Sequence, residues 1–128
     1  MNAWTFEITT GKLFDDKMIY QSSGYSGGNC GKNPEGKNNT ADERLKDIGP
    51  IPEGLYRKGK LVPHSHLGVD AIELIPDPSN DMKGRSDLYM HGDTTPPGNA
   101  SEGCVIQPHP QRIAWFNSDC PLNVVAQI

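Results

Sequence analysis

The opening of the chain alternates between apolar and polar side chains. Trp4, Phe6 and Ile8 are each followed by a polar residue, and this period of two is typical of a strand with one buried face. Lys12–Phe14 and residues 18–22 are further short stretches with apolar positions, and turn residues separate them. The pattern predicts a three-stranded antiparallel meander.

The stretch that follows is polar and aperiodic. Residues 24–39 are rich in Gly, Asn and Lys, so we expect a surface loop, either a mobile connection or a flap that touches a substrate. Residues 40–43, Thr-Ala-Asp-Glu, have the form of a capping box, which predicts one or two helical turns over residues 41–46.

Two longer strands are expected in the middle of the chain. Residues 48–56 hold two prolines and two glycines, which predict a rigid turn. A strand is expected over residues 55–61 and another over residues 70–75, where a proline ends it. Residues 77–86 are polar and predict a loop.

The C-terminal part of the chain predicts a short helix and a last strand. Residues 111–117 follow a proline, which suits the first turn of a helix. Ile113 and Phe116 are expected to face the core, and Trp115 to cover a neighbouring edge. Residues 122–128 are expected to close the chain as a strand.

Composition narrows the fold class. The chain has 128 residues, with 14 Gly, 11 Pro and 34% hydrophobic residues, which favours short strands and many turns over a helical bundle. We expect one domain over residues 1–128, mainly β: a small β-sandwich with one or two short helices. The net charge of −4 argues against a nucleic-acid partner. No apolar run approaches the length of a transmembrane helix, so we expect no membrane insertion.

A histidine and a cysteine flank a loop rich in Gly and Pro. Apolar residues precede His91 and follow Cys104, so we expect two short strands that bring both side chains to the rim of the sheet. A cysteine becomes a good nucleophile when a nearby base favours its thiolate, and a neutral histidine can take that proton and later return it. The alternative is a buried structural cysteine and a histidine that merely share the loop.

The residues next to the cysteine extend this interpretation. Gly103 has no side chain, so the backbone can approach a substrate closely there. The amide of Cys104, with a neighbouring N–H, can stabilise an oxyanion. Ser101 either hydrogen-bonds to the catalytic pair or holds the loop through a local backbone bond.

Motifs in the chain occur in an order that resembles one family. Residues 91–93, His-Gly-Asp, followed by residues 101–105, Ser-Glu-Gly-Cys-Val, resemble the signature of the L,D-transpeptidases. Residues 49–56, Gly-Pro-Ile-Pro-Glu-Gly-Leu-Tyr, and residues 77–86 resemble the branch of effectors that bacterial type VI secretion systems export. The resemblance spans nearly the whole chain and implies an L,D-transpeptidase-like fold.

The resemblance implies a peptidoglycan-modifying enzyme. Cys104 would attack the stem tetrapeptide at the L-centre of diaminopimelate, and the terminal D-alanine would leave as a thioester forms, with His91 as base and then acid. Water as the acceptor gives an L,D-carboxypeptidase, and a D-amino acid gives exchange. No metal or cofactor is implied. The alternative function is a catalytically inactive module that binds cell-wall peptide.

The match departs from many L,D-transpeptidases at two positions. Those enzymes carry a second His before the Gly-Cys pair and an Arg two residues after the Cys, where this chain has Glu102 and Ile106. Both changes agree with the effector branch. A carboxylate close to the thiol of Cys104 is expected to raise the pKa of that thiol, which would increase the dependence on His91.

Further polar residues near these motifs are candidates for the site. The candidate catalytic residues are Cys104, His91, Ser101 and Gly103. The candidate substrate-binding residues are Arg85, Asp93, Gly92, Glu102 and His66. Arg85 is expected to meet a substrate carboxylate, with a surface salt bridge as the alternative. Asp93 either orients His91, binds a substrate amine, or forms a turn with Thr94.

The other histidines are weaker candidates. His64 and His66 would share a face if they lay on a strand, and could then bind a metal. No HExxH or CxxC motif accompanies them, and the residues around them suggest a loop. We therefore expect histidines of the surface or of a substrate groove. His109 is expected to be solvated.

The remaining cysteines and the N-terminus bear on localisation. Cys30 and Cys120 either form a disulfide, which would suit an oxidising compartment, or are two separate free thiols. The first residues lack the basic start and apolar run of a secretory signal. Together with the resemblance, this predicts delivery by a secretion machine into the periplasm of a target bacterium. The expected partners there are peptidoglycan stem peptides and a cognate immunity protein.

Overall fold

The computed structural model describes residues 2–94 and 97–128 of a mainly β protein, as the sequence predicts. The strands are β1 (Trp4–Glu7), β2 (Lys12–Phe14), β3 (Tyr20–Ser23), β4 (Tyr25–Ser26), β5 (Gly54–Ser65), β6 (Gly68–Pro76), β7 (Tyr89–His91), β8 (Val105–Ile106) and β9 (Leu122–Val125). The described helices are α1 (His109–Asn117) and the 3-10 turns η1 (Asn29–Gly31), η2 (Pro34–Gly36) and η3 (Thr40–Asp42). None of them is long and apolar enough to cross a bilayer.

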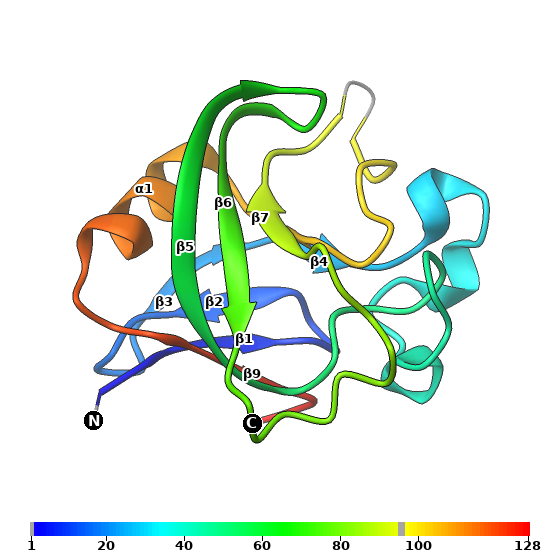
Figure 1. The fold of residues 1–128 in the computed structure, drawn as a ribbon, viewed down its shortest axis with the longest axis horizontal. Helices are drawn as coiled ribbons and strands as arrows, with labels where there is room; N and C mark the ends of the chain where they lie inside the picture. The colour runs from blue at the N-terminus through cyan, green and yellow to red at the C-terminus, as the bar shows by residue number, and fades with distance from the viewer. Residues whose placement is uncertain (1, 95–96) are drawn as a thin grey trace.

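The nine described strands form one sheet in the order β3-β2-β1-β9-β5-β6-β7-β8-β4. The predicted meander is present, because β1, β2 and β3 pair in antiparallel sequence. Strand β5 joins the two halves of the sheet: its first three residues pair with β9, and its length pairs with β6. The pairing of β5 with β6 shifts register between Lys58 and Leu61, and such an irregularity bends a strand. In Figure 1, β5 and β6 accordingly run across β1 and β9.

One hydrophobic core lies between the two halves of this bent sheet, which gives the sandwich-like packing that the composition predicts. Phe6 and Leu13 reach it from the first half, and Ile72 and Met90 from the second. The half-buried strand predicted for β1 is wrong, because all four of its residues are buried. The Glu7 carboxylate accepts hydrogen bonds from the Thr10 hydroxyl and the Ile128 amide, so it is paired within the protein.

Helix α1 packs on the core mainly through Trp115, which is fully buried. Of the two side chains predicted to face the core, Phe116 packs against it half-buried, and Ile113 is half-buried outside the core cluster. The Trp115 ring lies under Lys58, whose Nζ donates to the carbonyls of Trp115 and Phe116 at 2.8 and 3.2 Å and also to that of Ser118. This lysine ties the C-terminus of α1 to β5.

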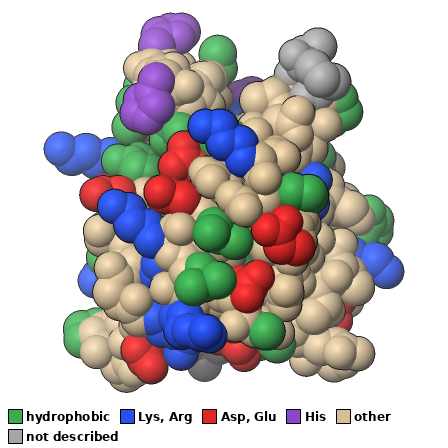
Figure 2. All heavy atoms as spheres, turned by 90° about the vertical axis from the view of Figure 1, so that its right-hand side faces the viewer, with side chains coloured by type: hydrophobic (Ala, Val, Ile, Leu, Met, Phe, Trp, Pro, Cys, Tyr) green, Lys and Arg blue, Asp and Glu red, His purple; other side chains and the backbone are tan. Residues whose placement is uncertain are grey.

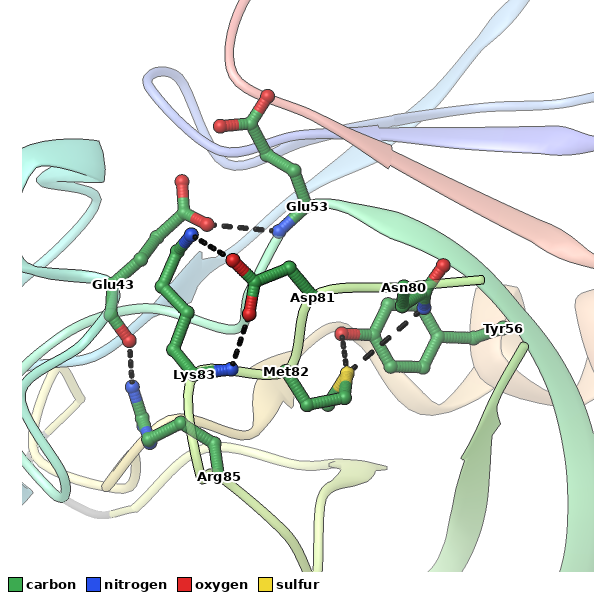
Figure 3. Close-up of polar contacts among 8 residues, drawn as sticks. All are labelled: Glu43, Glu53, Tyr56, Asn80, Asp81, Met82, Lys83 and Arg85. Atoms are coloured by element: carbon green, nitrogen blue, oxygen red, sulfur yellow. Dashed lines mark hydrogen bonds and ion pairs between the residues drawn. The ribbon is translucent and has the colours of Figure 1, made fainter. Parts of the chain in front are cut away.

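The segment predicted as one loop contains more structure than expected. It begins with β4, which pairs with β8, and continues through η1 and η2. The helix predicted over residues 41–46 is only the 3-10 turn η3, and the capping residue is Asn39, whose side chain accepts from the Ala41 amide at 3.1 Å. Glu43 takes no part in a capping box because its carboxylate accepts from the Glu53 amide at 2.9 Å instead (Figure 3).

Several strand ends also differ from the prediction. Strand β3 begins two residues later than expected, because Met18 has a φ of 62°, outside the extended region. Strand β5 continues to Ser65, four residues beyond the predicted end, because β6 pairs with it as far as Gly68. Strand β9 ends at Val125.

Candidate active site

The predicted pair of short strands exists, and the two strands are neighbours. Strands β7 and β8 are parallel, with Met90 opposite Val105 and His91 opposite Ile106. This register sets Tyr89 opposite Cys104, and the Tyr89 amide donates to the Cys104 sulfur at 3.4 Å. Since side chains two residues apart on a strand share a face, Cys104 and His91 belong to the same face of the sheet.

Both side chains line one groove of about 560 Å³. Its other walls are the tip of the β5–β6 hairpin and the segment before β7; they include Val62, Ser65, His66, Leu67, Arg85, Leu88 and Tyr89. Figure 2 shows the molecule hollowed between two projections, one of which carries histidine side chains in purple. The predicted loop between His91 and Cys104 forms part of the rim, and Thr95 and Pro96 of that loop lie outside the described residues.

The hydrogen bonds of His91 fix which ring nitrogen can act as a base. Its Nδ1 lies 2.9 Å from the Gly92 carbonyl oxygen, which can only accept, so Nδ1 carries the hydrogen. Nε2 is buried and has no hydrogen-bond partner among the described residues. Burial lowers the pKa of His91, and the nearby Arg112 guanidinium lowers it further. The imidazole is therefore neutral at pH 7, with a lone pair available on Nε2.

The Cys104 thiol is held in its protonated form. Only 9% of the residue is exposed, and burial raises the pKa of the thiol to about 11. The Glu102 carboxylate raises this pKa further, in the direction that the sequence predicts, while the Tyr89 amide and the Arg85 guanidinium oppose the shift. Formation of a thiolate here requires a base close by.

The loop before β8 is fixed by its carbonyl groups. The carbonyl of Glu102 accepts from Arg85, that of Gly103 accepts from the Ser26 hydroxyl, and that of Cys104 accepts from the Ser101 hydroxyl. In a trans peptide the N–H points away from the carbonyl, so each of these bonds also sets the direction of an amide. The backbone around the sulfur is thus held in one conformation.

Ser101 and Gly103 have structural contacts that the sequence only partly indicates. The Ser101 hydroxyl donates to the Cys104 carbonyl at 2.7 Å and accepts from the amides of Gly27 and Gly103, which is the loop-holding alternative. Gly103 has a φ of 127°, and a Cβ there would lie 2.1 Å from Nη2 of Arg85. The space expected for a substrate beside Gly103 is occupied by Arg85.

Arg85 lies inside the protein, with 7% of its surface exposed. Its guanidinium donates to the carbonyls of Glu43, Gly49, Pro50 and Glu102 at 2.7 to 3.2 Å. Figure 3 shows it directed at the Glu43 carbonyl. The guanidinium of Arg85 is therefore neither exposed to meet a substrate carboxylate, as expected, nor part of a surface salt bridge.

Asp93 is held by the turn that it starts. Its Oδ1 accepts from the amides of Thr94 and Gly98 and from the hydroxyl of Tyr25. Of the three roles considered for Asp93, these bonds match the turn, because the Nδ1 of His91 is already bonded to a carbonyl. Tyr25 in turn accepts from the Ala100 amide at 2.8 Å, so both ends of the loop are tied to β4.

The remaining candidates are distributed around the groove. Glu102 lies on its wall and accepts from the Cys30 thiol at 3.4 Å. His66 lies at the hairpin tip on the opposite wall. Gly92 packs against Arg112, since a Cβ there would lie 3.1 Å from Nη1. Among the described residues no group of three His, Cys, Asp or Glu side chains is arranged to hold a metal ion.

The structure also shows the state of the three cysteines and the surroundings of His109. Cys30, Cys104 and Cys120 are all free thiols, so of the two alternatives for Cys30 and Cys120 the structure has separate free thiols. Cys120 packs against the core, whereas Cys30 lies at the groove loop. His109 is exposed but not simply solvated, because its Nε2 lies 2.8 Å from Oδ2 of Asp70.

Two residues that position the site are missed by the sequence pattern. The Ser26 hydroxyl donates to the Gly103 carbonyl and accepts from the Ile51 amide. Arg112 donates to the carbonyls of Gln107, Val69 and Asp70 behind Gly92. Ser26 belongs to a two-residue strand, too short for periodicity, and Arg112 follows no motif.

Comparison with known proteins gives one match. The chain matches the family described as the Tlde1 domain over residues 21–127, which include all but the first residue of β3, all of β4 to β9, and the whole groove. No curated protein and no solved structure matches the chain.

Proposed function

The chain belongs to the Tlde1 domain family of type VI secretion effectors, and from this we propose that it is a cysteine-dependent L,D-transpeptidase or L,D-carboxypeptidase. Its substrates are the tetrapeptide stems of peptidoglycan. The observation that carries the proposal is that His91 and Cys104 line the same groove. A buried Nε2 without a hydrogen-bond partner among the described residues, in the groove of a protonated thiol, fits a general base and its nucleophile.

The first half of the reaction forms a thioester. Nε2 of His91 takes the proton of the Cys104 thiol, and the sulfur attacks the carbonyl carbon at the L-centre of the third stem residue. The bond from that carbon to the nitrogen of the terminal D-alanine breaks, and the imidazolium gives its proton to the departing amine. Backbone amides of the anchored loop, with that of Cys104 first, stabilise the oxyanion between these events.

The second half transfers the acyl group. Nε2 of His91 takes a proton from water or from the amine of a D-amino acid, and this acceptor attacks the thioester carbon. The carbon–sulfur bond breaks, and the sulfur recovers the proton from the imidazolium. Water yields a tripeptide stem, and a D-amino acid yields an exchanged tetrapeptide.

The site of action follows from the substrate. Peptidoglycan lies in the periplasm of Gram-negative bacteria, so the secretion system delivers the protein into that compartment of a target cell. A producing cell then needs an immunity protein in its own periplasm that covers the groove. No metal or cofactor takes part in the proposed reaction.

Product analysis with defined substrates tests the proposal. Purified tetrapeptide muropeptides are incubated with the wild type, Cys104→Ala and His91→Asn, with and without a D-amino acid, and analysed by mass spectrometry. We expect D-alanine release or exchange by the wild type, and a loss of at least about a thousandfold in either variant. Cys120→Ala is the matched control, since Cys120 packs against the core outside the groove. The proposal fails if the wild type releases and exchanges no D-alanine.

The alternative of an inactive peptide-binding module has one observation in its favour. The pKa of Cys104 is about 11, so little thiolate exists at neutral pH without a base. A binding module would retain muropeptide affinity in Cys104→Ala, and Cys104 would react with a thiol probe no faster than Cys120. Labelling of Cys104 that depends on His91 excludes this alternative.

A further inference from the structure

Arg85 combines two features that need a common explanation. It is a buried cation, and the ion pairs of the described residues, Lys83 with Asp81 and His109 with Asp70, do not include it. Its guanidinium donates to four backbone carbonyl oxygens, all of them neutral. Burying a guanidinium without an ion pair is unfavourable, and the Asp47 and Glu43 carboxyls, which favour its charge, form no ion pair with it. A purely structural link would be made at lower cost by a neutral side chain.

The acceptors of Arg85 come from separate parts of the chain. Glu43 follows η3, Gly49 and Pro50 belong to the Pro- and Gly-rich turn before β5, and Glu102 belongs to the loop that carries the nucleophile. The guanidinium therefore ties that loop to the backbone on both sides of Lys46 and Asp47, which line the groove. Gly103 packs against the same guanidinium so closely that it leaves no room for a Cβ.

The Glu102 carbonyl is the link between Arg85 and the reacting atoms. Its bond to Nη2 is 3.2 Å long, and it turns the Gly103 amide to the opposite side of the peptide, where that amide donates to Ser101 at 3.0 Å. Two residues further on, the Cys104 carbonyl accepts from the same serine. A change at Arg85 is thus transmitted to the backbone on both sides of the sulfur.

The charge of Arg85 also acts on the Cys104 thiol. The charged or titratable groups that act on the thiol are Glu102 and Cys30, which disfavour the thiolate, and Arg85, which favours it. His91 shares the groove and is neutral. Arg85 is therefore the cation whose field opposes burial and Glu102 at the sulfur.

We propose that Arg85 is a positioning residue: it anchors the loop that carries Cys104 through the Glu102 carbonyl, and its unpaired charge stabilises the thiolate and the oxyanion. The proposal rests on the proposed function for its catalytic meaning. It replaces the expectation that Arg85 recognises a substrate carboxylate. It predicts that Arg85 affects the thiol itself, even when no substrate is present.

The first experiment titrates the thiol without substrate. In a Cys30→Ser/Cys120→Ser background, the rate of alkylation of Cys104 by iodoacetamide is measured against pH, which gives its apparent pKa. Arg85→Met is expected to raise that pKa by about one pH unit, and Arg85→Lys to leave it near the wild-type value because the charge remains. Lys58→Met is the matched control, since it removes another cation that donates to backbone carbonyls, at α1 and outside the groove. It is expected to leave the thiol titration unchanged.

The second experiment separates positioning from binding. Both Arg85→Lys and Arg85→Met are expected to lower kcat for D-alanine release by about tenfold or more, with little change in KM, because the carbonyl fork is lost in both. If Arg85 instead bound a substrate carboxylate, its substitution would raise KM and leave the apparent pKa of the Cys104 thiol unchanged. Far-UV circular dichroism checks that each variant is folded; if Arg85→Met is not, the loss of kcat in Arg85→Lys is the test.

The outcomes distinguish this inference from the proposed function. A folded Arg85→Met variant with a wild-type thiol titration overturns the inference, and so does an Arg85→Lys variant with wild-type kcat. A wild type that releases no D-alanine overturns the proposed function. A shift of the thiol titration in Arg85→Met would in that case still support Arg85 as the anchor of Cys104.

Discussion

At the scale of single residues, the surroundings of Gly103 allow no side chain at that position. Its φ of 127° disfavours any side chain, and Arg85 occupies the position of a Cβ. Gly103→Ala is therefore expected to lower the free energy of unfolding by about 3 kcal/mol. Urea denaturation measures this loss. Gly84→Ala is the control, because Gly84 has a φ of 75° with nothing within 4 Å of a Cβ, and it is expected to lose about 1 kcal/mol. Equal losses of unfolding free energy in the two variants would mean that the Arg85 side chain moves aside for the new Cβ at little cost.

His91 determines the acid side of the pH dependence. Burial lowers its pKa from the ordinary value of 6.5, so the imidazole stays neutral, and able to accept a proton, to a lower pH than an exposed histidine. The rate of D-alanine release is expected to fall on the acid side with a midpoint below the ordinary histidine value of 6.5. His109→Gln, outside the groove of His91 and Cys104, is expected to leave that midpoint in place. An NMR titration that places His91 at or above 6.5 would contradict the assignment.

The sequence predicts individual residues of the site unevenly. The positions of His91 and Cys104 on adjacent strands follow from the apolar residues beside each, and the structure brings both into one groove. The contacts of Arg85 do not follow, because its acceptors are carbonyl groups. Every residue carries a carbonyl, so no side-chain pattern marks those that a folded chain turns toward one guanidinium.

At the scale of elements, Lys58 joins β5 to the C-terminus of α1. Its ammonium donates to the carbonyls of Trp115, Phe116 and Ser118 at the end of the helix, where backbone carbonyls lack partners within the helix. Lys58→Met keeps the aliphatic stem and loses these bonds, and we expect the free energy of unfolding to fall by about 2 kcal/mol. Urea denaturation is the measurement. Lys60→Met, on the exposed part of the same strand, is expected to change it by less than about 0.5 kcal/mol. Similar losses of unfolding free energy in the two variants would show that the bonds from Lys58 to the end of α1 add no stability.

Elements were predicted well where periodicity is strong. The strand Lys12–Phe14 has the predicted bounds, and β6 and α1 begin within two residues of theirs. Strand β4 escapes prediction because two residues cannot show a period, and its existence depends on β8 as a partner. The full burial of Trp115 does not follow from the sequence pattern, because it depends on Lys58 of β5, whose ammonium lies over the Trp115 ring.

At the scale of the whole molecule, stability is expected to depend on pH through Glu43. Burial raises the pKa of this carboxyl from 4.5 to about 7, and the neighbouring Glu53 carboxylate adds to the shift. A carboxyl with a raised pKa in the folded state binds its proton more tightly there than in the unfolded chain. Its contribution to stability is therefore complete below about pH 4.5 and is lost as the pH rises through 7.

Glu43→Gln tests this dependence, because the amide oxygen can still accept from the Glu53 amide. The Tm of the wild type is expected to fall between pH 5 and pH 8, and that of the variant to change less. Glu73→Gln is the control, since Glu73 is half-buried on β6 and also accepts from one backbone amide. It is expected to keep the wild-type slope. A wild-type slope in Glu43→Gln would show that other groups govern the pH response.

The position of β9 has a consequence for how the protein is made. This strand is inserted between β1 and β5, parallel to β1 and antiparallel to β5, although residues 122–125 are the last of the strands to leave the ribosome. Until they emerge, the meander and the half that carries His91 and Cys104 each expose an unpaired edge. A nascent chain therefore has no continuous sheet to support the half that carries His91 and Cys104 until β9 has been synthesised.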